Sequence, residues 1–195
     1  MQIMRASEFG PDAKRQMGDI FADGFYQWLN YFSKDKVKLA NAFRHMFNLE
    51  LFYVAVINGE MAGMAACTDG KARSVHLDGK ELRKHLGLMR GTIAAFVLKR
   101  EFEGRPYPFE IREGMGLVEF VATASNYRGQ GVATAIMQHI FTSTPFDEYA
   151  LEVADTNTNA VKLYEKLGFH EFMRVKQKHS ERSGVNYLVY MKASG

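Results

Sequence analysis

Apolar residues recur at three- and four-residue spacings in two stretches near the start of the chain, the pattern of helices that bury one face. The first stretch follows Pro11, a residue favoured in the first turn of a helix. Its apolar positions are Met17, Ile20, Phe21, Phe25 and Trp28. Ser33 is the N-cap predicted for the second helix. The apolar face of that helix carries Leu39, Ala40, Phe43 and Phe47. A short strand over residues 2–6 is expected before both helices.

A β-hairpin is predicted where two apolar runs, residues 51–57 and 61–67, flank the dipeptide Asn58-Gly59. Asparagine and glycine both tolerate the positive φ angles that a type I′ turn requires. This is the clearest local prediction in the chain.

Residues 69–116 predict a helical insertion between strands. Asp78 followed by Glu81 resembles a capping box at a helix start. A helical stripe follows, bent at Gly87 and ended by Gly104 and Pro106. The stripe consists of Leu82, Leu86, Met89, Ile93, Phe96, Val97 and Arg100. Because this segment is too short to bury a core of its own, a single domain over residues 1–195 is expected.

The rest of the chain alternates strand-like apolar runs with helical patterns, an order typical of an α/β fold with a mixed sheet. The predicted strands are residues 117–123, 149–153, 169–178 and 185–192, the last two joined by a polar turn around 180–184. The predicted helices are residues 131–143 and 157–167. Gly168 suits the left-handed position that ends the second of these helices.

Composition excludes several classes of protein. The net charge of +3 comes without a dense run of Lys or Arg, so no nucleic-acid partner is expected. No apolar run is long enough to span a bilayer and no signal core is present, so we expect a cytoplasmic protein without a membrane partner. Cys67 is the only cysteine, which excludes an internal disulfide and favours a buried, inert thiol. The histidines lack metal-ligand spacing, so no metal is predicted.

Candidate chemistry is concentrated in the turn Tyr127–Ala133, which contains Gly129 and Gly131 and lies between a strand and a helix. The first amides of a helix have no intrahelical partner, and the helix dipole favours an anion there. Glycine lets the backbone approach a ligand closely. With the charge of Arg128, the turn predicts a phosphate site.

Two segments together resemble the GNAT acetyltransferase superfamily. Arg128-x-x-Gly131-x-Ala133 after a strand is similar to that family's acetyl-CoA-binding signature. Residues 157–169, an asparagine before a helix with Leu163-Tyr164 and a final Gly168-Phe169, are similar to its second segment. The resemblance implies a GNAT-like, mixed and mostly antiparallel central sheet flanked by helices. It also implies N-acetyl transfer from acetyl-CoA to an amine. Direct transfer in a ternary complex is expected, because no nucleophile for a covalent acyl-enzyme is evident in the sequence. The insertion departs from a minimal family member and leaves the acceptor open.

The resemblance also implies which residues bind the cofactor. The backbone of Arg128, Gly129, Gln130, Gly131, Val132 and Ala133 is expected at the pyrophosphate. The backbone of Val121, Ala122 and Thr123 is expected to pair with the pantetheine arm, because the fourth strand of the family diverges from the fifth. Asn157 is expected to bond the cofactor, to cap its helix, or to do both.

Two residues are predicted to move protons. Tyr164 matches the family's general acid for the leaving thiolate, and its alternative role is that of a core tyrosine. Glu119 is the candidate base, because a carboxylate inside an apolar strand suggests a cleft. The two-residue period of a strand places it on one face with Leu117 and Val121. Its alternative role is a salt bridge at a strand edge.

The acceptor is predicted only as a small-molecule amine or a peptide amine. Residues 26–32 are rich in aromatic side chains that could enclose it, although Trp28 is expected in the core. His179, Tyr187 and Tyr190 of the final hairpin lie near the usual acceptor side of the family. A non-catalytic acyl-CoA sensor is the alternative function, and a nucleotide site is disfavoured because no Gly-Lys-Ser/Thr follows the turn. A homodimer stays open.

Overall fold

A seven-stranded sheet with the order β1-β2-β3-β4-β5-β7-β6 runs through the protein. The computed structural model describes residues 1–177 and 184–195, so His179 and most of the predicted turn around 180–184 lie outside the described residues. The strands are β1 (Gln2–Arg5), β2 (Phe52–Ile57), β3 (Glu60–Thr68), β4 (Met115–Thr123), β5 (Glu148–Ala154), β6 (His170–Lys176) and β7 (Tyr187–Ser194). Neighbouring strands pair antiparallel except β4 and β5, which pair parallel.

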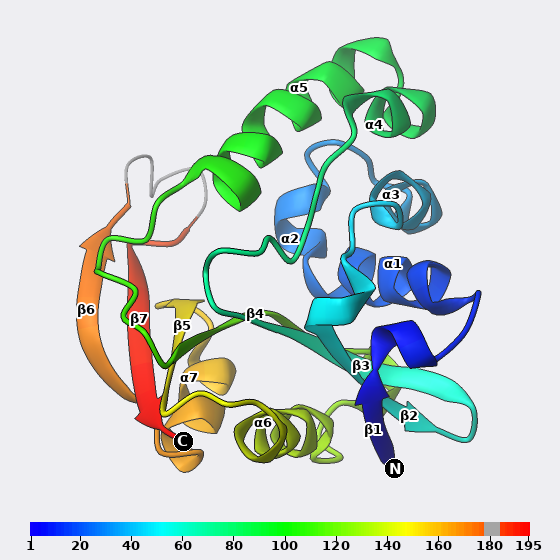
Figure 1. Cartoon of the computed structure of the whole chain (residues 1–195). Helices are drawn as coiled ribbons and strands as arrows, with labels where there is room; N and C mark the ends of the chain where they lie inside the picture. The colour runs from blue at the N-terminus through cyan, green and yellow to red at the C-terminus, as the bar shows by residue number, and fades with distance from the viewer. Residues whose placement is uncertain (178–183) are drawn as a thin grey trace.

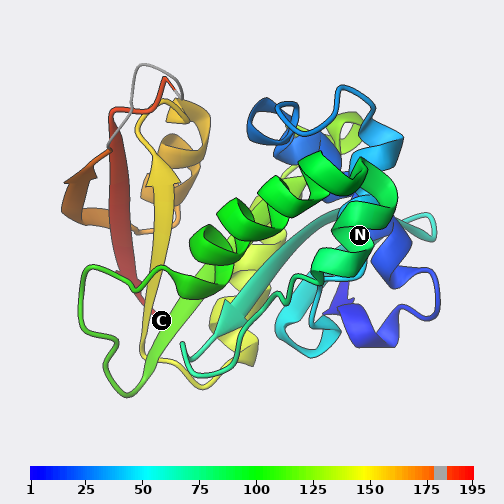
Figure 2. The same ribbon diagram turned by 90° about the horizontal axis from the view of Figure 1, so that it is seen from above.

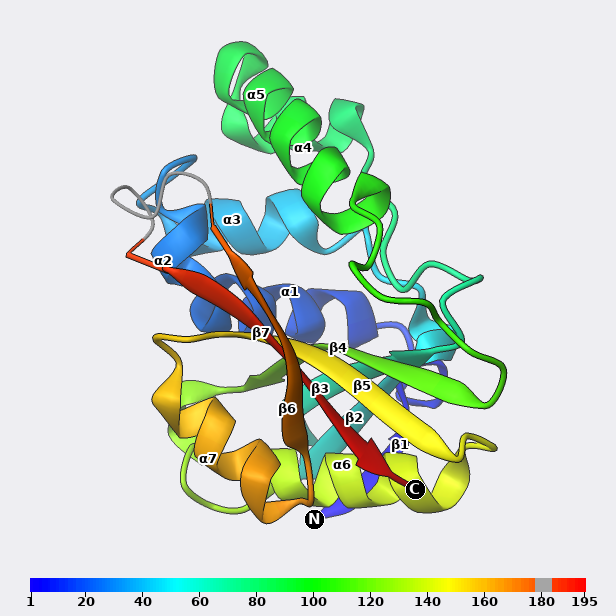
Figure 3. The same ribbon diagram turned by 90° about the vertical axis from the view of Figure 1, so that its left-hand side faces the viewer.

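Helices cover both faces of the sheet, as Figures 1 and 3 show. One face carries α6 (Val132–Ser143) and α7 (Thr158–Lys166). The other carries α1 (Ala13–Gly24), α2 (Tyr26–Leu29), α3 (Lys36–Phe43), α4 (Gly79–Leu86) and α5 (Leu88–Lys99). A separate apolar cluster fills each layer, and we refer to them as the α6–α7 cluster and the α1–α5 cluster. The sheet therefore separates two cores.

The first helices differ from the sequence prediction in two details. Asp35, not Ser33, is the N-cap of α3, because its carboxylate accepts hydrogen bonds from the Val37 and Lys38 amides. The Ser33 hydroxyl instead accepts from the Asp35 amide, one step before the helix. Trp28 is also not a core residue, since 39% of it is exposed on the short helix α2.

The predicted hairpin is confirmed. Asn58 and Gly59 join β2 to β3 with φ angles of 51° and 83°, as a type I′ turn requires. The predicted helix end at Gly168 is confirmed in the same way, with a φ of 90° after α7.

The insertion forms two helices that meet at Gly87, whose φ is 84°. Asp78 caps α4 through the Lys80 amide, as predicted. A π-helical turn (Arg100–Gly104) then ends α5. The apolar stripe faces outward in α5, where the buried positions are Gly91, Ala94 and Leu98 and the exposed ones include Met89 and Phe96.

Strand β4 contains a β-bulge at Phe120. Its register against β3 passes from Ala66↔Glu119 to Met64↔Ala122, so two β4 residues oppose one β3 residue. Phe120 has a φ of 52°, an uncommon conformation for a bulky side chain. The extra residue breaks the strand alternation. Val121 therefore packs against the α6–α7 cluster, and the prediction that it shares a face with Leu117 and Glu119 is wrong.

The parallel pairing of β4 with β5 ends early. It runs only from Met115↔Glu148 to Val118↔Leu151, although β4 continues to Thr123 against β3. Figure 2 shows the two strands starting side by side and separating. Because a bulge bends its strand, the bulge that follows Glu119 accounts for the separation. We call the end of this pairing the β4–β5 divergence.

Candidate active site

The turn before α6 presents a row of free backbone amides. Gly129 and Gly131 have φ angles of 75° and 77°, and Ala135 is the first residue of the helix whose amide is bonded, to the Gly131 carbonyl. Within the described part of the chain, the amides from Gly129 to Thr134 have no acceptor. A side chain built at either glycine meets no protein atom within 4 Å. Free amides facing open space at a helix start can hold a phosphate group.

Arg128 extends across this turn toward α1. Its guanidinium lies 2.8 Å from the Asp23 carboxylate and donates from Nε to the Thr123 carbonyl oxygen at 3.3 Å. More than half of its side chain is exposed. Its charge is therefore partly neutralised by Asp23, and the backbone amides are the stronger part of the anion site.

The outer edge of β4 lies open next to this turn. Gly63 and Met64 of β3 pair with Thr123 and Ala122 on one side, and β5 has left the other side. A strand edge without a partner can pair with an extended ligand. Asn157 follows β5 and caps α7, accepting a hydrogen bond from the Ala160 amide at 3.3 Å. The cap role of Asn157 is thus confirmed, and its cofactor role stays a prediction.

Tyr164 lies in the α6–α7 cluster on the inner side of α7. The residue is 6% exposed, and its ring packs against Phe169 with centroids 5.8 Å apart. Among the described residues its hydroxyl has no hydrogen-bond partner. Burial raises the pKa of Tyr164 above the usual value for a phenol, so the hydroxyl keeps its proton at neutral pH. The ring of Tyr164 is therefore part of the core, and its hydroxyl still carries a proton that it can donate.

Glu119 faces the opposite layer at the β4–β5 divergence. One carboxylate oxygen accepts a hydrogen bond from the Tyr107 hydroxyl at 2.6 Å, and the other accepts from the Ser74 hydroxyl. No cation pairs with it among the described residues, which argues against the salt-bridge alternative. Burial and the Glu119 charge raise the pKa of Tyr107, which keeps that hydroxyl a donor.

A second carboxylate, Glu152, stands beside the first. The last parallel pair is Val118↔Leu151, and the residues that follow on the two strands are Glu119 and Glu152. Glu152 accepts a hydrogen bond from the Tyr190 hydroxyl at 2.6 Å and pairs with Arg105 of the insertion. Sequence reasoning did not select Glu152, although it has the same signal as Glu119, a carboxylate between apolar strand residues.

The aromatic residues after α1 contact one another in a row that ends at the bulge beside Glu119. The rings of Trp28 and Phe25 lie 6.0 Å apart, and those of Phe25 and Phe120 lie 6.1 Å apart. They connect the exposed indole to the bulge beside Glu119. Tyr31 is exposed and Tyr187 packs against Arg174 on the final hairpin, so neither joins this group.

Other reactive groups do not form a competing centre. Cys67 is buried on β3, and burial raises the pKa of its thiol to about 12, so the thiolate form is disfavoured. In residues 1–177 and 184–195, no cluster of at least three His, Cys, Asp or Glu side chains could hold a metal ion.

Comparison with protein families identifies the fold. The sequence model described as the acetyltransferase (GNAT) family matches residues 15–169. The chain belongs to the GNAT acetyltransferase family. The match includes the turn before α6, the β4–β5 divergence and α7. The mixed, mostly antiparallel sheet flanked by helices confirms the predicted fold class.

Solved structures with this GNAT fold are remote in sequence. An N-acetyltransferase from Staphylococcus aureus Mu50 has 17% identity and a TM-score of 0.63, covering 99% of this chain and 100% of that one. A ribosomal-protein-alanine N-acetyltransferase from Brucella melitensis has 16% identity and a TM-score of 0.59, with 100% of both chains covered. No curated protein matches the sequence. None of the helices described here combines the length and apolar character needed to cross a bilayer.

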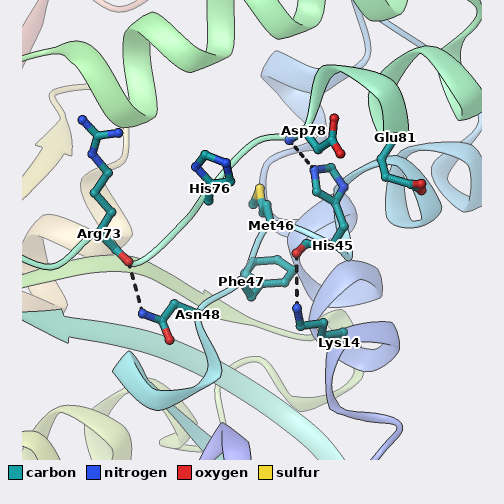
Figure 4. A pocket seen from close by; sticks show the side chains of 9 residues that line it. All are labelled: Lys14, His45, Met46, Phe47, Asn48, Arg73, His76, Asp78 and Glu81. Carbon is teal, nitrogen blue, oxygen red and sulfur yellow. Dashed lines mark hydrogen bonds between the residues drawn. The ribbon is translucent and has the colours of Figure 1, made fainter.

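A pocket of about 510 Å³ in this GNAT protein has a lining that does not include the candidate residues Glu119 and Tyr164 (Figure 4). Ser74 bonds Glu119, whereas its neighbours Arg73 and His76 line the pocket. His45 connects the end of α3 to the insertion, because its Nε2 accepts a hydrogen bond from the Asp78 amide at 2.8 Å. That bond requires a neutral imidazole.

Stability should therefore fall in mild acid through His45. Burial lowers the pKa of His45 from 6.5, opposed by Asp78 and Glu81. Its contribution is present above pH 6.5 and is lost as the pH falls through the lower pKa of the folded state. We expect His45→Gln to lose less stability than the wild type as the pH falls below 6.5, because glutamine can accept the Asp78 hydrogen bond without titrating. Urea unfolding of both proteins above and below pH 6.5 measures the change in the free energy of unfolding. An equal loss of stability in the wild type and in His45→Gln would refute the prediction.

Proposed function

We propose that this chain is an acetyl-CoA-dependent N-acetyltransferase that transfers the acetyl group directly to an amine. One observation carries the proposal. Where β4 leaves β5, it carries Glu119 on one face and packs on the other against the cluster that holds Tyr164, and it leads on to the free amides from Gly129 to Thr134. Membership of the acetyltransferase family supports it.

The residues fit two parts of the donor, its pyrophosphate and its pantetheine arm. The amides before α6 suit its pyrophosphate, and the open edge at Val121, Ala122 and Thr123 suits the amide groups of its pantetheine arm. When bound, acetyl-CoA supplies an acetyl group activated as a thioester. Asn157 stands at the start of α7 and can donate from its side-chain nitrogen while its oxygen caps the helix.

Glu119 and Tyr164 divide the proton transfers. An alkylamine with a pKa of about 10.4 is almost wholly protonated at neutral pH, so Glu119 attracts the ammonium and passes its proton toward solvent. The new C–N bond forms as the C–S bond breaks. Tyr164 gives its proton to the departing sulfur from the other face of the sheet, and the second proton that the nitrogen loses as the amide forms restores the Tyr164 hydroxyl. The step is uphill by pKa, but burial raises the free energy of a thiolate as well as that of a phenolate.

We favour direct transfer because the thiol of Cys67, the only cysteine of the sequence, is not available as a nucleophile. Cys67 lies within β3 with a thiol pKa of about 12, so an acyl-enzyme on it is disfavoured. The acceptor attacks the donor itself, and both must be bound together.

The proposal is tested by calorimetry with acetyl-CoA and by a thiol-release assay over a panel of small amines and peptides. We expect binding and amine-dependent thiol release. No binding at millimolar acetyl-CoA would remove the donor assignment. Binding without release on any amine would favour the alternative function, a sensor of acyl-CoA.

A methyl group at Gly131 should weaken cofactor binding. Its Cβ would meet no protein atom, so the substitution Gly131→Ala places the methyl where a phosphate would approach. Losing one charge-assisted hydrogen bond of about 1.5–3 kcal/mol predicts a loss of acetyl-CoA affinity of roughly tenfold to a hundredfold. Calorimetry measures it.

Gly168→Ala is the matched control. Gly168 also has a positive φ and no atom near its Cβ position, but it lies at the other end of α7 from Asn157. Both variants should lose about 1–2 kcal/mol of stability to backbone strain. Equal acetyl-CoA affinity in the two variants would contradict the phosphate assignment.

A further inference from the structure

Residues 105–109, just after the π-helical turn, lie over the face of the sheet that carries Glu119 and Glu152. Arg105 pairs with Glu152 of β5, and the Tyr107 hydroxyl donates to Glu119 of β4. The Phe109 ring lies 5.1 Å from Phe172 of β6 and 5.7 Å from Tyr190 of β7, measured between centroids. The insertion therefore forms part of the wall beside the β4–β5 divergence.

Arg105 adds the only cation among the described side chains that bond this pair of carboxylates. The formal charges of the two carboxylates and the one guanidinium sum to −1. Tyr107, Ser74 and Tyr190 bond the carboxylates as neutral donors. One net negative charge matches an acceptor that carries a single ammonium group.

Glu152 could bind a cation in place of Arg105. Both contacts to it, from Arg105 and from Tyr190, go to Oε2, and Oε1 has no partner among the described residues. Its side chain is 26% exposed and that of Arg105 is 34% exposed, so the pair is accessible to solvent. A second Arg105 nitrogen lies 3.8 Å from Glu101, one turn earlier, which gives the guanidinium another partner.

We propose that Arg105 determines acceptor specificity by occupying, on Glu152, the place of a second cation of the acceptor. The enzyme then prefers acceptors with one positive charge at the reacting end over diamines and over peptides with a cationic second residue. This inference rests on the proposed N-acetyltransferase function and adds to it the charge class of the acceptor.

The test compares acceptors that differ by one charge. Pentylamine is paired with 1,5-diaminopentane, and a peptide with norleucine as its second residue is paired with the lysine peptide. The enzyme will use the amines or the peptides as acceptors. Within the pair that it uses, we expect the wild type to have the higher kcat/KM for the acceptor with one positive charge. Arg105→Gln should raise the ratio of dication to monocation by about tenfold, the effect of roughly 1.4 kcal/mol of restored attraction.

Arg105→Lys is the matched control, because it keeps the charge beside Glu152 and should leave the ratio within about twofold. Calorimetric titration of the same amines into CoA-loaded protein gives a second readout, in which Arg105→Gln should bind 1,5-diaminopentane more tightly than wild type. Thermal melting and CoA affinity establish that each variant is folded.

Three results would overturn the inference. Wild-type preference for the dication would do so without any variant. Retained transfer by Arg105→Gln with an unchanged ratio would overturn it while leaving the proposed function intact. Transfer by the wild type to no amine at all would overturn both.

Discussion

Tyr164→Phe is expected to lower kcat by about a hundredfold to ten-thousandfold, the usual contribution of a positioned general acid. The hydroxyl has no structural partner among the described residues, so its removal leaves no bonded group unsatisfied. The phenyl ring keeps the packing against Phe169. Acetyl-CoA affinity should therefore change by no more than about twofold, and thiol-release kinetics with calorimetry separate the two effects.

Tyr53→Phe is the control for this prediction. Tyr53 belongs to the same α6–α7 cluster, and its buried hydroxyl also has no hydrogen-bond partner in the described ranges. It lies on β2, with β3 between it and β4. If both variants lose activity equally, the loss comes from the cluster and Tyr164 is not the acid.

Glu119→Gln is expected to lower kcat/KM by about a hundredfold or more near neutral pH. Glutamine keeps the shape of the side chain but removes the charge that attracts the ammonium and receives its proton. The defect should shrink at high pH, because an amine with a pKa of about 10.4 then loses its proton without a base. A pH profile of kcat/KM from about pH 7 to about pH 9.5 measures this recovery.

Glu148→Gln is the matched substitution on β5. Glu148 pairs with Lys192 at 2.9 Å, at the end of the strand opposite Glu152, and should affect activity little. A Glu119→Gln defect of constant size at every pH would assign Glu119 to positioning instead of proton transfer. Full activity of Glu119→Gln would exclude both roles.

Local sequence patterns predicted most of the elements, because each depends on a few adjacent residues. Asn58 and Gly59 determine a turn by their own φ preferences, and Gly168 ends a helix for the same reason. Two of the errors lie near the first helices. Ser33 and Asp35 are both good caps, and only the path of the chain selects Asp35. Trp28 has the spacing of a core residue but follows a break in the helix, which turns it outward.

The sequence likewise indicated some parts of the candidate active site and missed others. The sequence alone determined the turn proposed as the anion site, since glycine positions and a helix start produce free amides wherever they occur. It also indicated Tyr164 and Glu119 as the candidate acid and base. What it did not indicate is Phe120, a bulky residue in a conformation that a single-residue preference opposes.

Only the tertiary structure decided the acceptor side. The pair Arg105–Glu152 joins residues 47 positions apart, and its existence depends on how the insertion packs over β5. The bulge at Phe120 depends on aromatic packing with Phe102 and Phe21 from other elements. Such contacts gain their free energy from long-range packing, to which local propensity contributes little. The sequence therefore determined the turn that we propose for the donor, and tertiary packing decided which charges line the proposed acceptor side.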